Sequence, residues 1–179
     1  MKKSFMAFAV LFLFAVQMNA QLDVSVNPIG ILFNSYDVSV ENGFSENFGV
    51  ELTVGLSTSK YSIDDEDISS TGFGTRLMAK YYLSPSKGLD RFNIGAYLRY
   101  GSNKFEDGTD EVSNTRIAGG FYLGYKIVSS KKIFFEIGFG VGKAFTNSYS
   151  VDGEEVVDGA DYPILNIDAT GKFAVGYRF

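Results

Sequence analysis

Much of the chain consists of stretches in which apolar and polar residues alternate one by one. In the last stretch, D-A-T-G-K-F-A-V-G-Y-R-F from Asp168 to Phe179, Tyr177 and Phe179 fall on one face and Lys172 and Arg178 on the other. Successive side chains of a pleated sheet point to opposite sides, so this period of two predicts a β-strand. The chain therefore ends in a predicted strand with an aromatic apolar face.

Six earlier stretches show the same alternation. Five long ones cover 48–58, 73–83, 92–100, 117–127 and 135–145, and a shorter one covers 36–41. A tilted strand that crosses a membrane needs about nine to eleven residues. Each long stretch is therefore long enough to cross a membrane as a strand.

The connections between these stretches alternate between short and long. Short connections lie near 42–47, 84–90 and 129–132, and long ones span 61–70, 105–112 and 148–161. The long connections carry most of the acidic residues and no lysine or arginine, whereas Lys87, Lys131 and Lys132 lie in the short ones. This order predicts an all-β, antiparallel up-and-down barrel with its short turns at one end.

The segment before residue 36 decides the number of strands. If both ends of the domain lie beside the short turns, one more strand must run from Asp23 to Phe33, followed by a tight turn at Asn34-Ser35. The alternation changes phase at Asn27-Pro28, and proline cannot donate to a sheet, so we predict a bulge there. Eight strands result. The alternative is that this segment threads or plugs the lumen.

Residues 1–20 have the features of a secretory signal peptide. Lys2 and Lys3 precede an uncharged run from Phe5 to Val16, and Ala20 is a suitable last residue before cleavage. The run is shorter than the roughly twenty apolar residues of a membrane helix. We therefore expect residues 21–179 to be exported and to form one domain.

The composition agrees with an exported sheet protein. The chain has 20 Gly, 17 Phe, 11 Tyr and only 3 Pro, and it has no Cys and therefore no disulfide. Its 21 acidic residues exceed its 16 basic ones, which argues against nucleic acid as a partner, because nucleic acid needs a basic surface. The mean hydropathy of +0.03 suits a membrane barrel, because half of each strand faces a polar interior.

Three sequence features together resemble a known class of membrane protein. The alternation that ends on Phe179 is similar to that of small eight-stranded outer-membrane β-barrel proteins of Gram-negative bacteria, such as OmpX and the transmembrane domain of OmpA. N-P-I-G-I-L-F at 27–33, followed by V-S-V-E at 38–41, resembles the start of outer-membrane β-barrel domain families. The resemblance implies location in the bacterial outer membrane and insertion by the barrel assembly machinery, which would recognise the strand ending at Phe179. It implies no ligand. We expect a monomer with short turns in the periplasm and long loops outside.

The polar faces of the predicted strands would line the interior of the barrel. An eight-stranded barrel is just wide enough for side chains to fill, and buried charges must be paired. We therefore predict an ion network interleaved with Tyr82, Tyr97 and Tyr122, in a non-enzymatic protein with a structural or surface-interaction role. The alternatives are a small-solute pore and a soluble lipocalin-like cup with an apolar interior. The charged inward set is Asp37, Glu41, Glu51, Arg76, Lys80, Arg99, Arg116, Lys126, Glu136, Asp168, Lys172 and Arg178.

The sequence contains no pattern of a catalytic or cofactor site. It has neither Cys nor His, so a serine nucleophile would lack its usual base. The acidic stretches at 64–67, 106–111 and 152–161 contain residue types that bind divalent cations, but none has the spacing of an EF-hand. We interpret them as solvated loops and predict no catalytic residue, no cofactor and no metal.

Three lysines on the lipid-facing phase are candidates for contact with a partner. Lys60, Lys104 and Lys143 all fall near the outer ends of the predicted strands. A long cationic side chain can reach the membrane surface from such a position, where the phosphates of lipopolysaccharide lie. The hypothesis is that they contact these phosphates. The alternative is simple exposure at the base of the loops.

Overall fold

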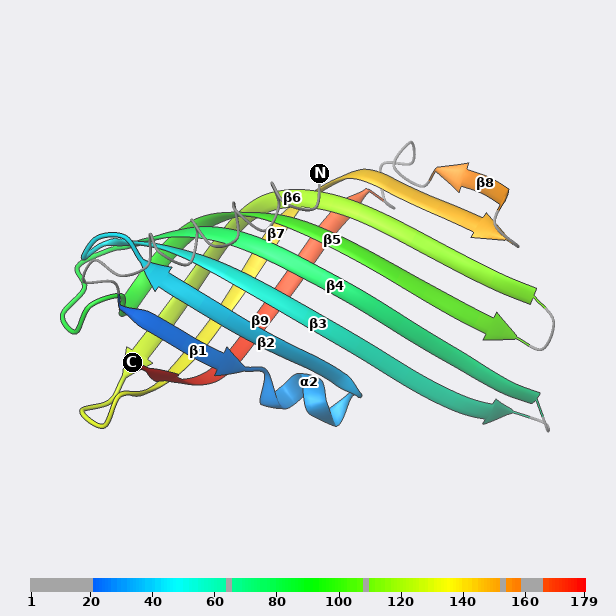
Figure 1. Ribbon diagram of the computed structural model, residues 1–179. Helices are drawn as coiled ribbons and strands as arrows, with labels where there is room; N and C mark the ends of the chain where they lie inside the picture. The colour runs from blue at the N-terminus through cyan, green and yellow to red at the C-terminus, as the bar shows by residue number, and fades with distance from the viewer. Residues whose placement is uncertain (1–20, 64–65, 108–109, 152–153, 159–165) are drawn as a thin grey trace, which may run out of the picture.

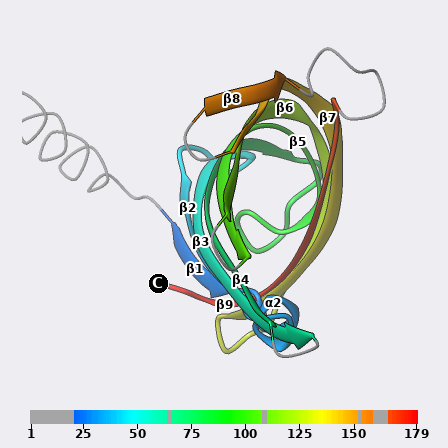
Figure 2. The same ribbon diagram turned by 90° about the vertical axis from the view of Figure 1, so that its right-hand side faces the viewer.

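The fold is a closed ring of antiparallel strands. The computed structural model describes residues 21–63, 66–107, 110–151, 154–158 and 166–179. The ring consists of eight strands, in which β1 pairs with both β2 and β9 and β6 pairs with β7 (Figures 1 and 2). The prediction of an all-β, eight-stranded antiparallel barrel is therefore confirmed. The elements are β1 (Leu22–Val26), α2 (Pro28–Leu32), β2 (Ser35–Gly43), β3 (Phe48–Ile63), β4 (Glu66–Tyr82), β5 (Arg91–Asp107), β6 (Asp110–Val128), β7 (Ile133–Val151), β8 (Glu154–Asp158) and β9 (Ile167–Arg178), of which β8 extends the sheet beside β7.

The alternation in sequence separates an apolar outside from a polar inside. In β7, Phe135, Ile137 and Phe139 are exposed, whereas Phe134 and Glu136 are buried. The same separation holds around the ring, because the strand register pairs outward-facing residues with outward-facing ones and inward-facing residues with inward-facing ones on neighbouring strands. The interior is therefore mostly polar, and its described apolar core is a small cluster of Met78, Tyr97 and Tyr122.

The strands are longer than their apolar stretches. The β3–β4 hairpin continues to the pair Ile63 and Glu66, and the β5–β6 hairpin to the pair Asp107 and Asp110. The prediction of long loops at 61–70 and 105–112 is therefore wrong for most of these residues, and the described residues of the third predicted loop, 148–161, belong to β7 and β8. A ladder satisfies backbone groups whatever the side chains are, so polar strands can extend a hairpin without an apolar period. We call this end of the barrel the hairpin end and the opposite one the turn end.

The segment after β1 is a short helix and not the predicted second half of a strand. Asn27 precedes α2 and accepts a hydrogen bond from the amide of Gly30 at 3.0 Å. Pro28 begins the helix, where a missing N–H costs nothing. The phase change at Asn27-Pro28 thus marks a helix start, and the prediction of a bulged strand to Phe33 is wrong beyond Val26. The count of eight strands is nevertheless correct, because β1 belongs to the wall of the barrel.

The helix lies where the wall would otherwise continue. On β9, pairing with β1 covers only Val175 to Arg178, and α2 lies beside β2 and the more distant part of β9 (Figures 1 and 2). Ile31 and Leu32 on α2 are exposed. The helix therefore presents apolar side chains on the same outer surface as the strands. Among the described residues, no helix combines the length and the apolar character needed to cross a membrane.

The β4–β5 turn folds across the turn end of the ring. Leu89 is buried, its amide donates to the side chain of Gln21 at 3.1 Å, and its carbonyl accepts from Arg178 at 2.9 Å. Gly88 has a φ of +75°, a left-handed conformation that glycine adopts without strain. The turn thus carries a buried side chain into the end of the lumen.

Candidate functional site

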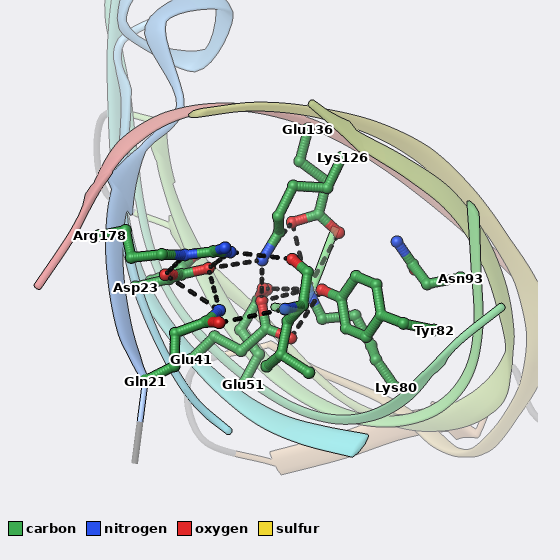
Figure 3. A network of polar contacts seen from close by, with 12 residues as sticks. Gln21, Asp23, Glu41, Glu51, Lys80, Tyr82, Asn93, Lys126, Glu136 and Arg178 are labelled. Atoms are coloured by element: carbon green, nitrogen blue, oxygen red, sulfur yellow. Dashed lines mark hydrogen bonds and ion pairs between the residues drawn. The ribbon is translucent and has the colours of Figure 1, made fainter. Parts of the chain in front are cut away.

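The half of the interior nearest the turn end holds a network of buried ion pairs. Lys80, from β4, lies at its centre (Figure 3). Its ammonium group donates to Glu41 at 2.8 Å, Glu51 at 2.7 Å and Glu136 at 2.9 Å. These carboxylates come from β2, β3 and β7, so a single lysine joins strands from several sides of the ring.

Asp23 connects the network to both ends of the domain. Arg178 donates to it through two nitrogens, each at 2.7 Å, which is the bidentate geometry that makes arginine–carboxylate pairs strong. Lys126 donates to Asp23 at 3.0 Å and also to Glu41. Because β1 and β9 are neighbours in the ring, these contacts help to close the barrel where its first and last strands meet.

Positive and negative charges are equal in number within this network. Lys172 completes it with bonds to Glu51 and to Glu136, the latter at 2.8 Å. Every carboxylate has at least one cationic partner, as buried charges require. The tyrosine hydroxyls of Tyr82 and Tyr122 add bonds to Glu41 at 2.7 Å and Glu136 at 3.3 Å. The network comprises Asp23, Glu41, Glu51 and Glu136 with Lys80, Lys126, Lys172 and Arg178.

Three carboxylates of the network have the geometry of a cation site. Oxygen atoms of Glu41, Glu51 and Glu136 lie within 4.8 Å of one another. The ammonium group of Lys80 already bonds to all three. This lysine supplies the positive charge that a metal ion would supply, so we assign the cluster a structural role.

The half of the interior nearest the hairpin end contains a cavity of about 280 Å³. Its basic lining residues include Arg76 of β4, Arg99 of β5 and Arg116 of β6. Small residues such as Gly74 and Gly101 lie between them on the same inner face and leave space. The lumen is therefore packed only in its turn-end half, which differs from the expectation of side-chain filling throughout.

Asp168 of β9 is the acid that faces these arginines most directly. It accepts from Arg99 at 2.7 Å, from Arg116 at 3.3 Å and from the hydroxyl of Tyr97 at 2.7 Å. Arg76 donates to the hydroxyl of Thr170 at 2.7 Å and lies 4.0 Å from Glu51. The cavity thus has a basic wall made by three adjacent strands, with Asp168 opposite and Asp37 of β2 also in its lining.

The structure places the predicted charged inward set and the three tyrosines inside the barrel. Asp37 differs from the other charged members because its hydrogen-bond partner is the side-chain amide of Asn27, at 3.0 Å. Sequence reasoning missed Asp23, although Asp23 and Ser25 alternate with Val24 and Val26. The alternation of apolar and polar residues was present there, but it covered only the five residues of β1.

The three lysines on the lipid-facing phase do not share one position in the barrel. Lys104 lies near the end of β5 and donates to Glu111 at 2.7 Å. Lys143 is exposed but is paired in register with Gly119 and Ile167, well before the end of β7 at Val151. The expectation of a position near the outer strand end is therefore wrong for Lys143 in β7. The side chain of Lys60 lies outside the part of the chain that the structure describes, as do residues 1–20 and their predicted signal peptide.

Comparisons of this chain with protein-family models, with curated proteins and with solved structures found no match.

Proposed function

We propose that this protein is an integral barrel of the bacterial outer membrane that has no enzymatic activity, blocks its own lumen at the turn end and acts as a structural or surface-interaction protein. The proposal rests on what the barrel exposes and on what it encloses. Its outside exposes a large number of apolar side chains, and its inside is charged. Both properties suit a protein surrounded by lipid and not one surrounded by water.

The arrangement of aromatic residues on the outside is the observation that carries this proposal. Membrane barrels have an apolar band bounded by aromatic residues at both interfaces. Leu52, Leu77, Leu98 and Leu123 form part of an exposed band between two such sets. The set toward the turn end is Phe48, Tyr81, Phe92, Tyr125, Phe135 and Tyr177, and the set toward the hairpin end is Phe73, Tyr100 and Phe145, while Phe121 and Phe139 lie within the band itself.

The charged interior favours a closed outer-membrane barrel over a lipocalin-like cup and over a small-solute pore. A lipocalin-like cup would need an apolar interior for its ligand and a polar outside, which is the reverse of what these strands present. A pore would need a continuous polar path, whereas Leu89 and the ion network occupy the turn-end half of the lumen. The cavity at the hairpin end does not by itself connect the two ends.

Membrane fractionation together with a gel-mobility assay tests the proposal. We expect the protein in the outer-membrane fraction, with a mobility in detergent that changes on boiling because the closed ring unfolds. Tags inserted at positions 65, 107 and 155 should be labelled on intact cells if the hairpin end faces outward. Recovery of the protein in the soluble periplasm with no mobility change would contradict the proposal, and unlabelled tags would contradict the orientation.

As part of this proposal, the lysines on the lipid-facing phase contact phosphates of lipopolysaccharide. Lys143 is exposed on the outer face, from which its side chain can extend toward the headgroups. Replacing Lys60, Lys104 and Lys143 by Gln should modestly reduce the amount of lipopolysaccharide that copurifies. Each substitution should weaken the binding free energy by about 1 kcal/mol, the contribution of one charge near the membrane surface. Equal lipid retention by the triple variant and the unmodified protein would leave these lysines without this role.

A further inference from the structure

The basic wall of the hairpin-end cavity brings like charges together. Arg76 and Arg99 are direct cross-strand partners on β4 and β5, and Arg116 is paired with Gly101, two residues along from Arg99. Like charges directly opposite each other destabilise a sheet. Three arginines on adjacent strands therefore repel one another unless negative charge lies among them.

The described acids do not balance these arginines. The turn-end network contains four acids and four bases and is neutral by itself. Glu51, the acid nearest Arg76, already accepts from Lys80 and Lys172. Asp168 faces both Arg99 and Arg116. Asp37, an acid in the lining of the cavity, bonds to the side-chain amide of Asn27. Among the described residues, the three arginines therefore outnumber the two acids, Asp37 and Asp168, at this cavity.

Two of the arginines keep donors that the described residues do not use. Arg99 donates to Asp168 through Nη2, and its side chain is 34% exposed. Arg76 donates to Thr170 through Nη1, and its Nε is buried without a partner in the described part of the chain. A guanidinium group carries five N–H donors in a fixed plane, so both side chains retain hydrogen-bonding capacity beside the cavity.

The cavity also has room beside these donors. A Cβ atom added at Gly101 would meet no atom within 4 Å, and one added at Gly74 would come no closer than 3.7 Å to its nearest neighbour. The volume of about 280 Å³ lies at the small end of the range for ligand sites, so it suits a small molecule. The hydroxyl of Thr170 and the amide of Asn103 line the same space.

We propose that this cavity binds a small oxyanion of the phosphate or carboxylate class between Arg76 and Arg99. An oxyanion can accept two parallel hydrogen bonds from one guanidinium group, a geometry that lysine cannot provide. It would also neutralise the repulsion between the paired arginines. The source of the oxygen atoms is either a free anion or the headgroup of a lipid. This inference goes beyond the proposed membrane role and does not require it.

Calorimetric titration of the purified, folded full chain with inorganic phosphate tests the site. The protein is held in zwitterionic detergent, so that the micelle contributes no anion. We expect saturable binding of one phosphate per barrel, weakened about tenfold or more in Arg76→Gln and in Arg99→Gln, because each removes a charged hydrogen-bond donor. Arg91→Gln is the matched control, since Arg91 is exposed at the start of β5, away from the cavity, and it should bind phosphate normally.

A second pair of variants tests the cavity without removing any charge. Gly101→Leu fills the inner space, whereas Gly171→Leu places the same side chain on the outer face, where an added Cβ also meets nothing within 4 Å. We expect Gly101→Leu to lose phosphate binding and Gly171→Leu to keep it. The gel-mobility assay shows whether each arginine variant folds. If one of them does not fold, this glycine pair still decides whether the cavity binds phosphate.

Micelles doped with dodecyl phosphate distinguish the two sources of the anion. Saturable binding of dodecyl phosphate but not of inorganic phosphate, lost in Gly101→Leu, would support the site and identify a lipid headgroup as its source. No saturable binding of either probe, or equal binding in Arg99→Gln, Gly101→Leu and the unmodified protein, would overturn the inference. Either result stands apart from membrane location, because the measurement uses purified protein.

Discussion

Lys80 is the residue on which the ion network depends most. It is fully buried and donates to three carboxylates from three different strands. Removing one partner of a buried ion pair leaves a charge without compensation and typically costs about 3–5 kcal/mol. We therefore predict that Lys80→Met lowers the free energy of unfolding by about this amount, measured by urea titration. Circular dichroism is the suitable signal, because the chain has no Trp.

Lys131→Met is the control for this measurement. Lys131 is exposed in the β6–β7 turn, and surface substitutions usually change the free energy of unfolding by less than about 0.5 kcal/mol. If Lys80→Met and Lys131→Met unfold at the same urea concentration, the network contributes no net stability. Its lysine would then be replaceable by an apolar side chain, as has been found for some buried ion pairs.

At the scale of one element, β9 has a structural role in closing the ring and a proposed role in recognition by the assembly machinery, and experiments can separate the two. Its backbone closes the ring between β1 and β7, and the amide of Phe179 donates to the carbonyl of Leu22 at 2.8 Å. The rings of Tyr177 and Phe179 instead point outward, with centroids 5.1 Å apart. We predict that Tyr177→Ser with Phe179→Ser sharply reduces insertion in cells, because the aromatic end signal is lost while the ladder is kept.

The control changes the same strand on the same face. Ile167→Ser with Phe173→Ser alters two outward positions of β9 away from its end and should reduce insertion less. Quantifying folded barrel in outer-membrane fractions compares the two variants, and refolding in detergent shows whether each chain can still close. Unchanged insertion of the terminal variant would contradict a recognition role for Phe179.

The whole molecule should conduct poorly. Eight strands leave little room once side chains fill the lumen, and the turn-end half holds Leu89 and the ion network. We predict no stable channel steps of porin size when the purified protein is reconstituted in planar bilayers. A porin measured in the same bilayers is the control for incorporation. Reproducible steps from this barrel would contradict the closed lumen and favour the alternative of a small-solute pore.

Most of the wall could be predicted from the sequence because the alternation of side chains is a local property. The stretches 48–58, 92–100 and 135–145 each lie inside an observed strand, and their inward charges, including Glu51, Arg99 and Glu136, line the interior. A period of two places a side chain on one face of a sheet whatever its neighbours are. Strand count and interior polarity therefore followed from the chain alone.

Only the tertiary structure decided which inward charges meet and where space remains. The balance of the turn-end network depends on register across β2, β3, β4 and β7, and on Asp23 reaching Arg178 through the closure of the ring. The pairing of Arg76 with Arg99 is likewise a matter of register. Helix α2 replaced a predicted strand because Asn27 caps it and bonds to Asp37. Apart from the local cap of α2, contacts between residues far apart in sequence set these features, and alternation along one strand carries no information about them.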